Sequence, residues 1–507
     1  MTLLSTGFSR RFAASLCVTS LLFSNLVSLP AFAKDPELTV YNQNFALVKD
    51  YRDIPLKSGR STVFLDDVAA LIDPTSVHFK SLTDPGGVGV LEQNFRYDLI
   101  SKSNILDRMV GKKIKFRKDG VTREGILLNP VTNYVRSGNS SHKTNTHEFA
   151  VQTDEGVLLT SLGEVIVNEV PEGLYPRPTL MWNLISDKGG THKTEVSYLT
   201  DNVKWDCDYV AVINDDDTEI DLTGWVTLDN QSGASYENAR LKLVAGDVQK
   251  IEPGGRGNAY AGRVAMKSIA MDEAREQFKE ESFFEYHLYT MKDRVTVANN
   301  ETKQVTLVSA NNVPLTKKYI YDPDRSQYTT WLRGHNHYFG TFDYYYNRPG
   351  QGSDTSTYKK VNTLVSIKNS KNNNLGIPLP KGKVRVNKAD SSGSLQFVGE
   401  DMIDHTPNDE TIELYLGDAF DLVGEKKMMN YRRDTDWIEQ TYEVKLKNRK
   451  KSGSVTINAL EHTFGDWKIV GSSHKWEKMD AHTISFPVTV PAGGEQTVSY
   501  TIKISRK

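Results

Sequence analysis

Apolar and polar residues alternate with a period of two along most of the chain, which is the pattern of half-buried β-strands. Apolar residues recur at every second position in 220–228, 239–244 and 442–446. Short β-branched and aromatic runs at 38–41 and 61–65 are bounded by turn residues, as strands usually are. The sequence therefore predicts an all-β protein.

The grouping of these strands predicts several β-sandwich domains, with a small SH3-like or Sm-like barrel inserted and an immunoglobulin-like sandwich at the C-terminal end. The barrel is expected because short strands there are joined by hairpin turns. We expect an N-terminal sandwich part at 34–108, the small barrel at 109–170, further sandwich strands at 190–248, a linker with an optional short helix at 249–281, a sandwich with an aromatic-rich insertion at 282–435, and the immunoglobulin-like sandwich at 436–507.

The first 33 residues follow a different pattern. Arg10 and Arg11 precede an apolar run at 12–29, and Ala-Phe-Ala at 31–33 stands directly before Lys34. A basic start, an apolar centre and an A-x-A site are typical of a Sec-type signal peptide, cleaved here after Ala33. An uncleaved membrane anchor is the alternative, and polar residues within the run disfavour it. We expect export to a bacterial periplasm or cell surface.

The composition of the chain limits the kinds of partner that the protein is expected to bind. The formal net charge is −2, and cleavage of the signal would remove two arginines and no acid. Basic and acidic residues are well mixed, so no basic patch for nucleic acid is predicted. No later run approaches the roughly 18 apolar residues of a membrane span. We therefore expect no nucleic-acid partner and no transmembrane segment in the mature chain.

Cleavage would also leave Cys207 as the only thiol, so the mature chain would contain no internal disulfide. Cys207 alternates with Asp206 and Asp208 in a strand pattern, which favours a buried structural position. A reactive thiol would need electropositive neighbours. A catalytic role is the less favoured reading.

A consistent order of short segments runs through the second part of the chain: WDCDY at 205–209, GWVTLDNQSG at 224–233, LVAGD at 243–247, EYHLY at 285–289, LGIPLPKG at 375–382 and FVGEDMIDHTP at 397–407. This order resembles the bacterial domain-of-unknown-function family numbered 4139, over most of the chain from about residue 190. The resemblance implies an exported all-β protein. It implies no catalytic residues, because no activity is established for the family.

The best enzymatic candidate is the group Glu400, Asp404 and His405, in which carboxylates beside an imidazole suggest acid–base chemistry or metal binding. On one extended strand the two carboxylates would lie about 13 Å apart at ~3.3 Å per residue. That separation is too large for the carboxylate pair of a glycosidase. A turn with capped backbone groups is the favoured interpretation.

Histidines suggest two weaker metal sites. His335 and His337 would lie on the same side of a strand and would form two zinc ligands if a third arrived. His462, His474 and His482 lie in the last predicted sandwich and could converge there. Neither spacing identifies a metal site, so no metal or other cofactor is predicted.

Aromatic residues are unusually dense between 319 and 346, and the strongest binding candidates among them are Tyr328, Trp331, Tyr338 and Tyr344. Such rings either form an exposed platform for sugars and peptides or fill the space between two sheets. Neighbouring arginines favour recognition.

No nucleophile elbow, phosphate loop or dinucleotide motif is present. The sequence therefore favours an exported cell-envelope binding protein over an enzyme, recognising a glycan or an envelope protein through an aromatic β-surface. Two alternatives stay open. One is an envelope hydrolase of glycan or peptide near Glu400, Asp404 and His405, and the other is a structural adaptor.

Overall fold

The computed structural model describes residues 35–137, 140–246, 248–250, 277–323, 358–463 and 465–505. Strands dominate these residues, with one α-helix, α1 (Lys102–Met109), and two 3-10 turns, η1 (Pro74–Ser76) and η2 (Lys371–Asn373). The predicted all-β, multi-sandwich class is confirmed. No helix in the described ranges is both long and apolar enough to cross a membrane.

An N-terminal sandwich is built from two sheets whose strands come from distant parts of the chain. The larger sheet has the order β18 (Phe278–Phe283), β19 (Tyr286–Met291), β17 (Tyr236–Ala245), β1 (Asp35–Tyr41), β2 (Phe45–Leu56), β14 (Gly190–Asp201) and β4 (His78–Ser81), with β20 (Val295–Val297) paired to β17. The smaller sheet has the order β3 (Gly59–Leu65), β13 (Thr179–Ser186) and β5 (Val88–Arg96).

The segments predicted at 34–108 and 190–248 thus share sheets and a single hydrophobic core. β1 pairs in parallel with β17, and β2 pairs with β14 over twelve residues. The optional helix predicted within 249–281 falls mainly outside the described residues, whereas β18 begins at the end of that segment. The sandwich is therefore completed only after much of the chain has been made.

A second, 13-stranded sheet begins beside this sandwich and runs into the C-terminal one. Its main path is β24 (Leu395–Ile403), β23 (Gly382–Ala389), β15 (Val203–Ile213), β16 (Glu219–Asn230), β21 (Glu301–Tyr321), β22 (Lys360–Lys368), β25 (Thr411–Arg433), β26 (Trp437–Asn448), β31 (Glu495–Ser505) and β28 (Trp467–Ser472). A branch adds β27 (Val455–His462), β30 (Thr483–Val490) and β29 (Glu477–Lys478).

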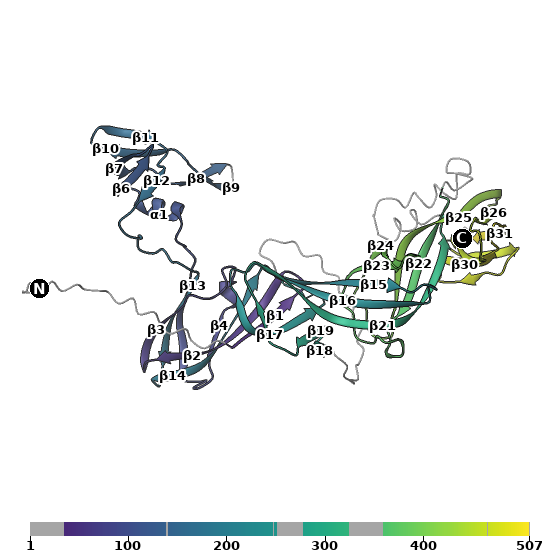
Figure 1. Cartoon of the computed structure of the whole chain (residues 1–507), viewed down its shortest axis with the longest axis horizontal. Helices are drawn as coiled ribbons and strands as arrows, with labels where there is room; N and C mark the ends of the chain where they lie inside the picture. Colours follow the sequence, from purple (N-terminus) through teal and green to yellow (C-terminus); the bar gives the residue numbers. More distant parts are fainter. Residues whose placement is uncertain are drawn as a thin grey trace, which may run out of the picture.

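The central strands of this sheet pass through two hydrophobic cores. β21 has 21 residues and β25 has 23. Leu315 and Leu416 belong to the N-terminal core, whereas Tyr321 and Leu422, on the same two strands, belong to the C-terminal core. Figure 1 shows β21 running lengthwise towards the C-terminal sandwich. The immunoglobulin-like sandwich predicted at 436–507 therefore also needs strands from before residue 436.

Two glycines on β25 allow this passage. Gly417 has φ +124°, a conformation that side chains rarely adopt, and it lies between the two cores. At Gly424 the ring of Tyr321 occupies the space that a Cβ would need. The tyrosine packs directly on the backbone, and its hydroxyl donates to the Tyr358 carbonyl at 3.0 Å.

The small unit inserted between β5 and β13 projects from the N-terminal sandwich in Figure 1. Its sheet has the order β11 (Gly156–Thr160), β10 (Phe149–Thr153), β7 (Val121–Leu127), β6 (Lys113–Lys118) and β12 (Glu164–Ile166), and a separate hairpin joins β8 (Thr132–Ser137) to β9 (Ser140–Asn145).

This unit has its own core, which includes Leu106 of α1 and Phe116 of β6. The sheet is open, because its outer strands β11 and β12 are not paired with each other among the described strands. The closed barrel predicted for 109–170 is therefore corrected. β12 has only three residues, and Leu159 on β11 is 77% exposed rather than turned into a closed interior.

A buried charge cluster joins the two layers of the C-terminal sandwich. Lys426 Nζ on β25 lies 2.6 Å from Glu461 Oε2 on β27, and their side chains are 8% and 6% exposed. The Tyr500 hydroxyl on β31 donates to the same carboxylate oxygen. The Lys426 ammonium also lies 4.5 Å from the ring centre of Tyr442. Each charge is thus compensated inside an otherwise apolar core.

This cluster yields a stability prediction. We expect Lys426→Met to lower the free energy of unfolding by about 3–5 kcal/mol, because it leaves the Glu461 carboxylate buried without its cation. The double variant Lys426→Met/Glu461→Leu should recover most of the loss. Guanidinium denaturation followed by near-UV circular dichroism measures both changes.

The matched control is Lys360→Met, which breaks the exposed ion pair with Asp418. It should change stability little, since exposed pairs contribute little. If Lys426→Met and Lys360→Met unfold at the same denaturant concentration as the unmodified protein, the buried pair does not stabilise the sandwich.

Candidate functional site

The structure places the predicted group Glu400, Asp404 and His405 in two different environments, a strand and the turn that follows it. Glu400 lies on β24, where its carboxylate is 3.6 Å from Lys383 Nζ and 3.5 Å from Arg385 Nε on β23. Arg385 also reaches Asp208 at 3.4 Å. Glu400 is therefore one member of a row of surface ion pairs, and its neighbours on the adjacent strand are cations.

His405 lies in the turn after β24 and contacts amide groups. Its Nδ1 accepts from the backbone N–H of Lys381 at 3.2 Å, and its Nε2 lies 3.4 Å from the side-chain amide of Asn42. In the same turn, the Thr406 hydroxyl donates to the backbone carbonyl of Asp404 at 2.8 Å. These contacts join the β1–β2 turn to the turn at 404–406, as a capped structural turn would. They favour this interpretation over an acid–base pair.

The binding and metal candidates Tyr328, Trp331, His335, His337, Tyr338 and Tyr344 all lie outside the described residues. Two aromatics at the start of the dense segment are described. Tyr321 is fully buried in the C-terminal core. The Tyr319 hydroxyl accepts from Lys450 Nζ at 2.7 Å. At least these two rings have structural roles between strands.

The C-terminal histidines do not form one cluster, although the backbone of His482 pairs with Thr463, next to His462. His462 is buried, with Nδ1 3.2 Å from the Thr483 hydroxyl and Nε2 3.2 Å from both carboxylate oxygens of Asp322. His474 is near the surface, with Nδ1 2.9 Å from the Ser473 hydroxyl. Within the described part of the chain, no group of three or more His, Cys, Asp or Glu side chains could hold a metal ion.

Cys207 occupies an inward position of β15 and is 3% exposed. Burial raises the pKa of its thiol to about 12; a hydrogen bond with Tyr209 acts in the opposite direction, and the nearby Asp208 and Asp206 raise the pKa further. The thiolate, which is the nucleophilic form, is therefore scarce at neutral pH.

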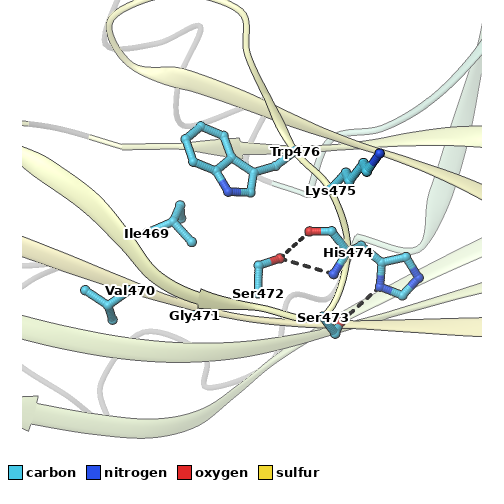
Figure 2. Close-up of a pocket in the computed structure, with 8 residues that line it drawn as sticks. All are labelled: Ile469, Val470, Gly471, Ser472, Ser473, His474, Lys475 and Trp476. Carbon is cyan, nitrogen blue, oxygen red and sulfur yellow. Dashed lines mark hydrogen bonds between the residues drawn. The ribbon is translucent and has the colours of Figure 1, made fainter.

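A shallow, open concavity lies at the edge of the C-terminal sandwich. We call it the edge groove; it has a volume of about 670 Å³ and is lined by residues 469–476. Figure 2 shows Trp476, Ile469 and Ser472 around a common space, with His474 and Lys475 along its rim. The groove thus combines an aromatic ring with hydroxyl, imidazole and ammonium groups.

The groove forms where the chain crosses from one sheet to the facing sheet. β28 is the last strand of the long sheet, and its pairing with β31 shifts register between Ile469 and Gly471. The loop after it leads to β29, which pairs with β30 in the facing layer. Because β28 has no further partner in the described sheet, its outer edge stays open.

Trp476 lines the groove, and Trp467 packs against it from β28. Trp467 on β28 and Trp476 in the loop have ring centres 6.3 Å apart at an interplanar angle of 61°. The Trp467 indole N–H donates to the Ala481 carbonyl at 2.9 Å, which anchors that ring across the open edge. Trp476 remains 38% exposed. An edge-to-face contact therefore holds one ring while leaving part of the other available to a ligand.

Hydrogen bonds inside the loop hold its shape. The Ser472 hydroxyl donates to the His474 carbonyl at 2.7 Å (Figure 2). The Ser473 hydroxyl accepts from the Ser499 N–H on β31 at 2.9 Å. A loop fixed in this way loses little conformational entropy when a ligand binds.

The sequence analysis missed this groove. The sequence pattern singles out His474 but neither tryptophan, and the eight positions between Trp467 and Trp476 carry no motif. The only available signal was the cluster of Ser, His, Lys and Trp at 472–476, which a surface loop would also have. Whether this cluster forms a binding surface depends on which strand lies at the edge of the sheet.

The chain matches no protein-family model, and a search of curated proteins finds no significant match. The resemblance to family 4139 therefore stays a prediction.

The setting of Cys207 predicts its reactivity. We expect the native protein to resist an aromatic disulfide reagent at pH 8, because the thiol is buried and protonated. One thiol should react once the mature protein, cleaved after Ala33, is unfolded in guanidinium. Rapid stoichiometric reaction of the folded protein would instead identify an accessible, activated cysteine.

Proposed function

We propose that the protein acts by binding, and that the edge groove is its ligand site. The observation that carries the proposal is Trp476, a partly exposed indole held against Trp467 in an open concavity. Aromatic rings provide a large contact area at low entropic cost. They are frequent at sites where binding energy is concentrated.

A saccharide is the ligand class that best fits this chemistry. The apolar face of a sugar ring stacks on an indole, while its hydroxyls need hydrogen-bond partners at the rim. Trp476 would supply the stacking surface, and His474 and Lys475 would supply polar contacts. The open edge would also let a longer glycan chain continue beyond the groove.

We also propose that the protein is exported and works in the cell envelope, as a member of the family numbered 4139. The residue pattern at 1–33 supports export, and the ordered segments from 205 to 407 support the family. A hydrolase near Glu400 is not favoured, because that carboxylate is paired with cations.

Export predicts a defined mature end. In a bacterial host, the periplasmic or extracellular form should begin at Lys34, because the A-x-A site ends at Ala33. Amino-terminal sequencing or intact mass measurement tests this, with Ala33→Lys as the variant that should slow cleavage. Recovery of the full chain from the membrane fraction would indicate an anchor instead.

Binding predicts a tryptophan-dependent affinity. For a tetrasaccharide of alternating N-acetylglucosamine and N-acetylmuramic acid, we expect Trp476→Ala to weaken binding about tenfold, which corresponds to ~1.4 kcal/mol. Titration calorimetry measures the affinity.

Trp437→Ala is the matched control. Trp437 lies in the same sandwich, on β26, with the Lys503 ammonium 4.0 Å from its ring centre, but it does not line the groove. Its variant should bind like the unmodified protein. Absence of binding, or equal losses in the two variants, would reject the edge groove as a saccharide site.

A further inference from the structure

We infer that the ligand of the edge groove is an anionic saccharide, one that carries carboxylate or phosphate groups. This inference rests on the proposed binding function and specifies its ligand class. It is based on the charge of two lysines, Lys475 and Lys478, which lie beside the tryptophans.

Two lysines lie beside the groove: Lys475 at its rim and Lys478 on β29. Neither forms an ion pair with a carboxylate in the part of the chain that the structure describes. Many lysines elsewhere are paired, such as Lys317 and Lys388, which both contact Asp217. The edge groove is therefore flanked by two ammonium groups that have no ion-pair partner among the described residues.

Lys478 has the most defined place among these lysines. Its ammonium lies 5.1 Å from the ring centre of Trp467, the indole that supports Trp476. A cation–π contact holds the charge near the aromatic wall. Its neighbour Glu477 belongs to the same short strand, β29. Because successive strand residues point to opposite faces, Glu477 is directed away from the face of Lys478.

A second pair of lysines is brought together by strand register. Lys468 on β28 lies directly opposite Lys503 on β31. Like charges in directly opposed positions destabilise a sheet. Both side chains lie on the outer face of the sheet, away from Trp467 and Ile469, and Lys503 also faces Glu439 on β26, so this pair is not part of the proposed site.

Lys475 completes the arrangement at the rim of the groove (Figure 2). An indole and nearby ammonium groups suit a ring that bears an acidic substituent. The ring stacks, and the acid group lies against the lysines. A neutral sugar would satisfy the aromatic wall and leave the cations without a partner.

The experiment compares two forms of one ligand. The probe is the tetrasaccharide of alternating N-acetylglucosamine and N-acetylmuramic acid, with its lactyl carboxylates either free or methyl-esterified. We expect the free acid to bind about tenfold more tightly than the ester at low salt, and the difference to shrink as salt rises.

Lysine variants test whether the groove causes the preference. Lys475→Gln/Lys478→Gln should reduce the ratio between free acid and ester to near one, because the free acid loses more affinity than the ester does. The matched control is Lys57→Gln, an exposed lysine of the N-terminal sandwich, which should leave the ratio unchanged.

The outcomes separate the two proposals. Equal binding of acid and ester, with loss of both in Trp476→Ala, would overturn the anionic preference and leave the saccharide site intact. A preference that persists in the double lysine variant would also overturn this inference. Failure of both forms to bind would reject the proposed function itself.

Discussion

The structure depends on the continuity of three strands, β21, β22 and β25, through two hydrophobic cores. Side chains alternate along a strand, so a shift of one residue would expose the inward set in both cores together. On β22, Val365 faces the N-terminal core and Val361 faces the C-terminal one. Register shifts in the β22–β25 pairing adjust the strands between these points. The two sandwiches therefore share backbone hydrogen bonds and cannot separate without breaking them.

That continuity also determines where a ligand can bind. The long sheet is occupied by its own strands as far as β31, and β28 is the last strand on its path. The edge groove forms at this end, where the loop crosses to the facing layer. Lys426, Glu461 and Tyr500 fix the spacing of the layers behind it. Trp467 and Trp476 thus belong to a rigid edge, although one of them lies in a loop.

Many strands could be predicted from local patterns. Alternation of apolar and polar residues indicates a strand with one buried face, whichever strand it pairs with. This is why strand β16 and the buried position of Cys207 could be predicted. Pairings between distant segments could not. The parallel contact of β1 with β17 joins residues about two hundred positions apart, and no local signal encodes it. The prediction that the small unit is a closed barrel was wrong for a related reason, because closure depends on contacts between its outermost strands.

The candidate site was hidden for a different reason. A tryptophan in a strand pattern predicts a core position, and lysines in a loop predict a solvated surface. Their joint meaning requires knowing that β28 is an edge strand and that Lys478 lies against the ring of Trp467. The whole chain carries a formal charge of only −2, so it has no long-range field that would attract anions. Selection of an acidic ligand would therefore depend on charges within about 10 Å of the indoles, the distance over which salt at 0.1 M leaves such interactions effective.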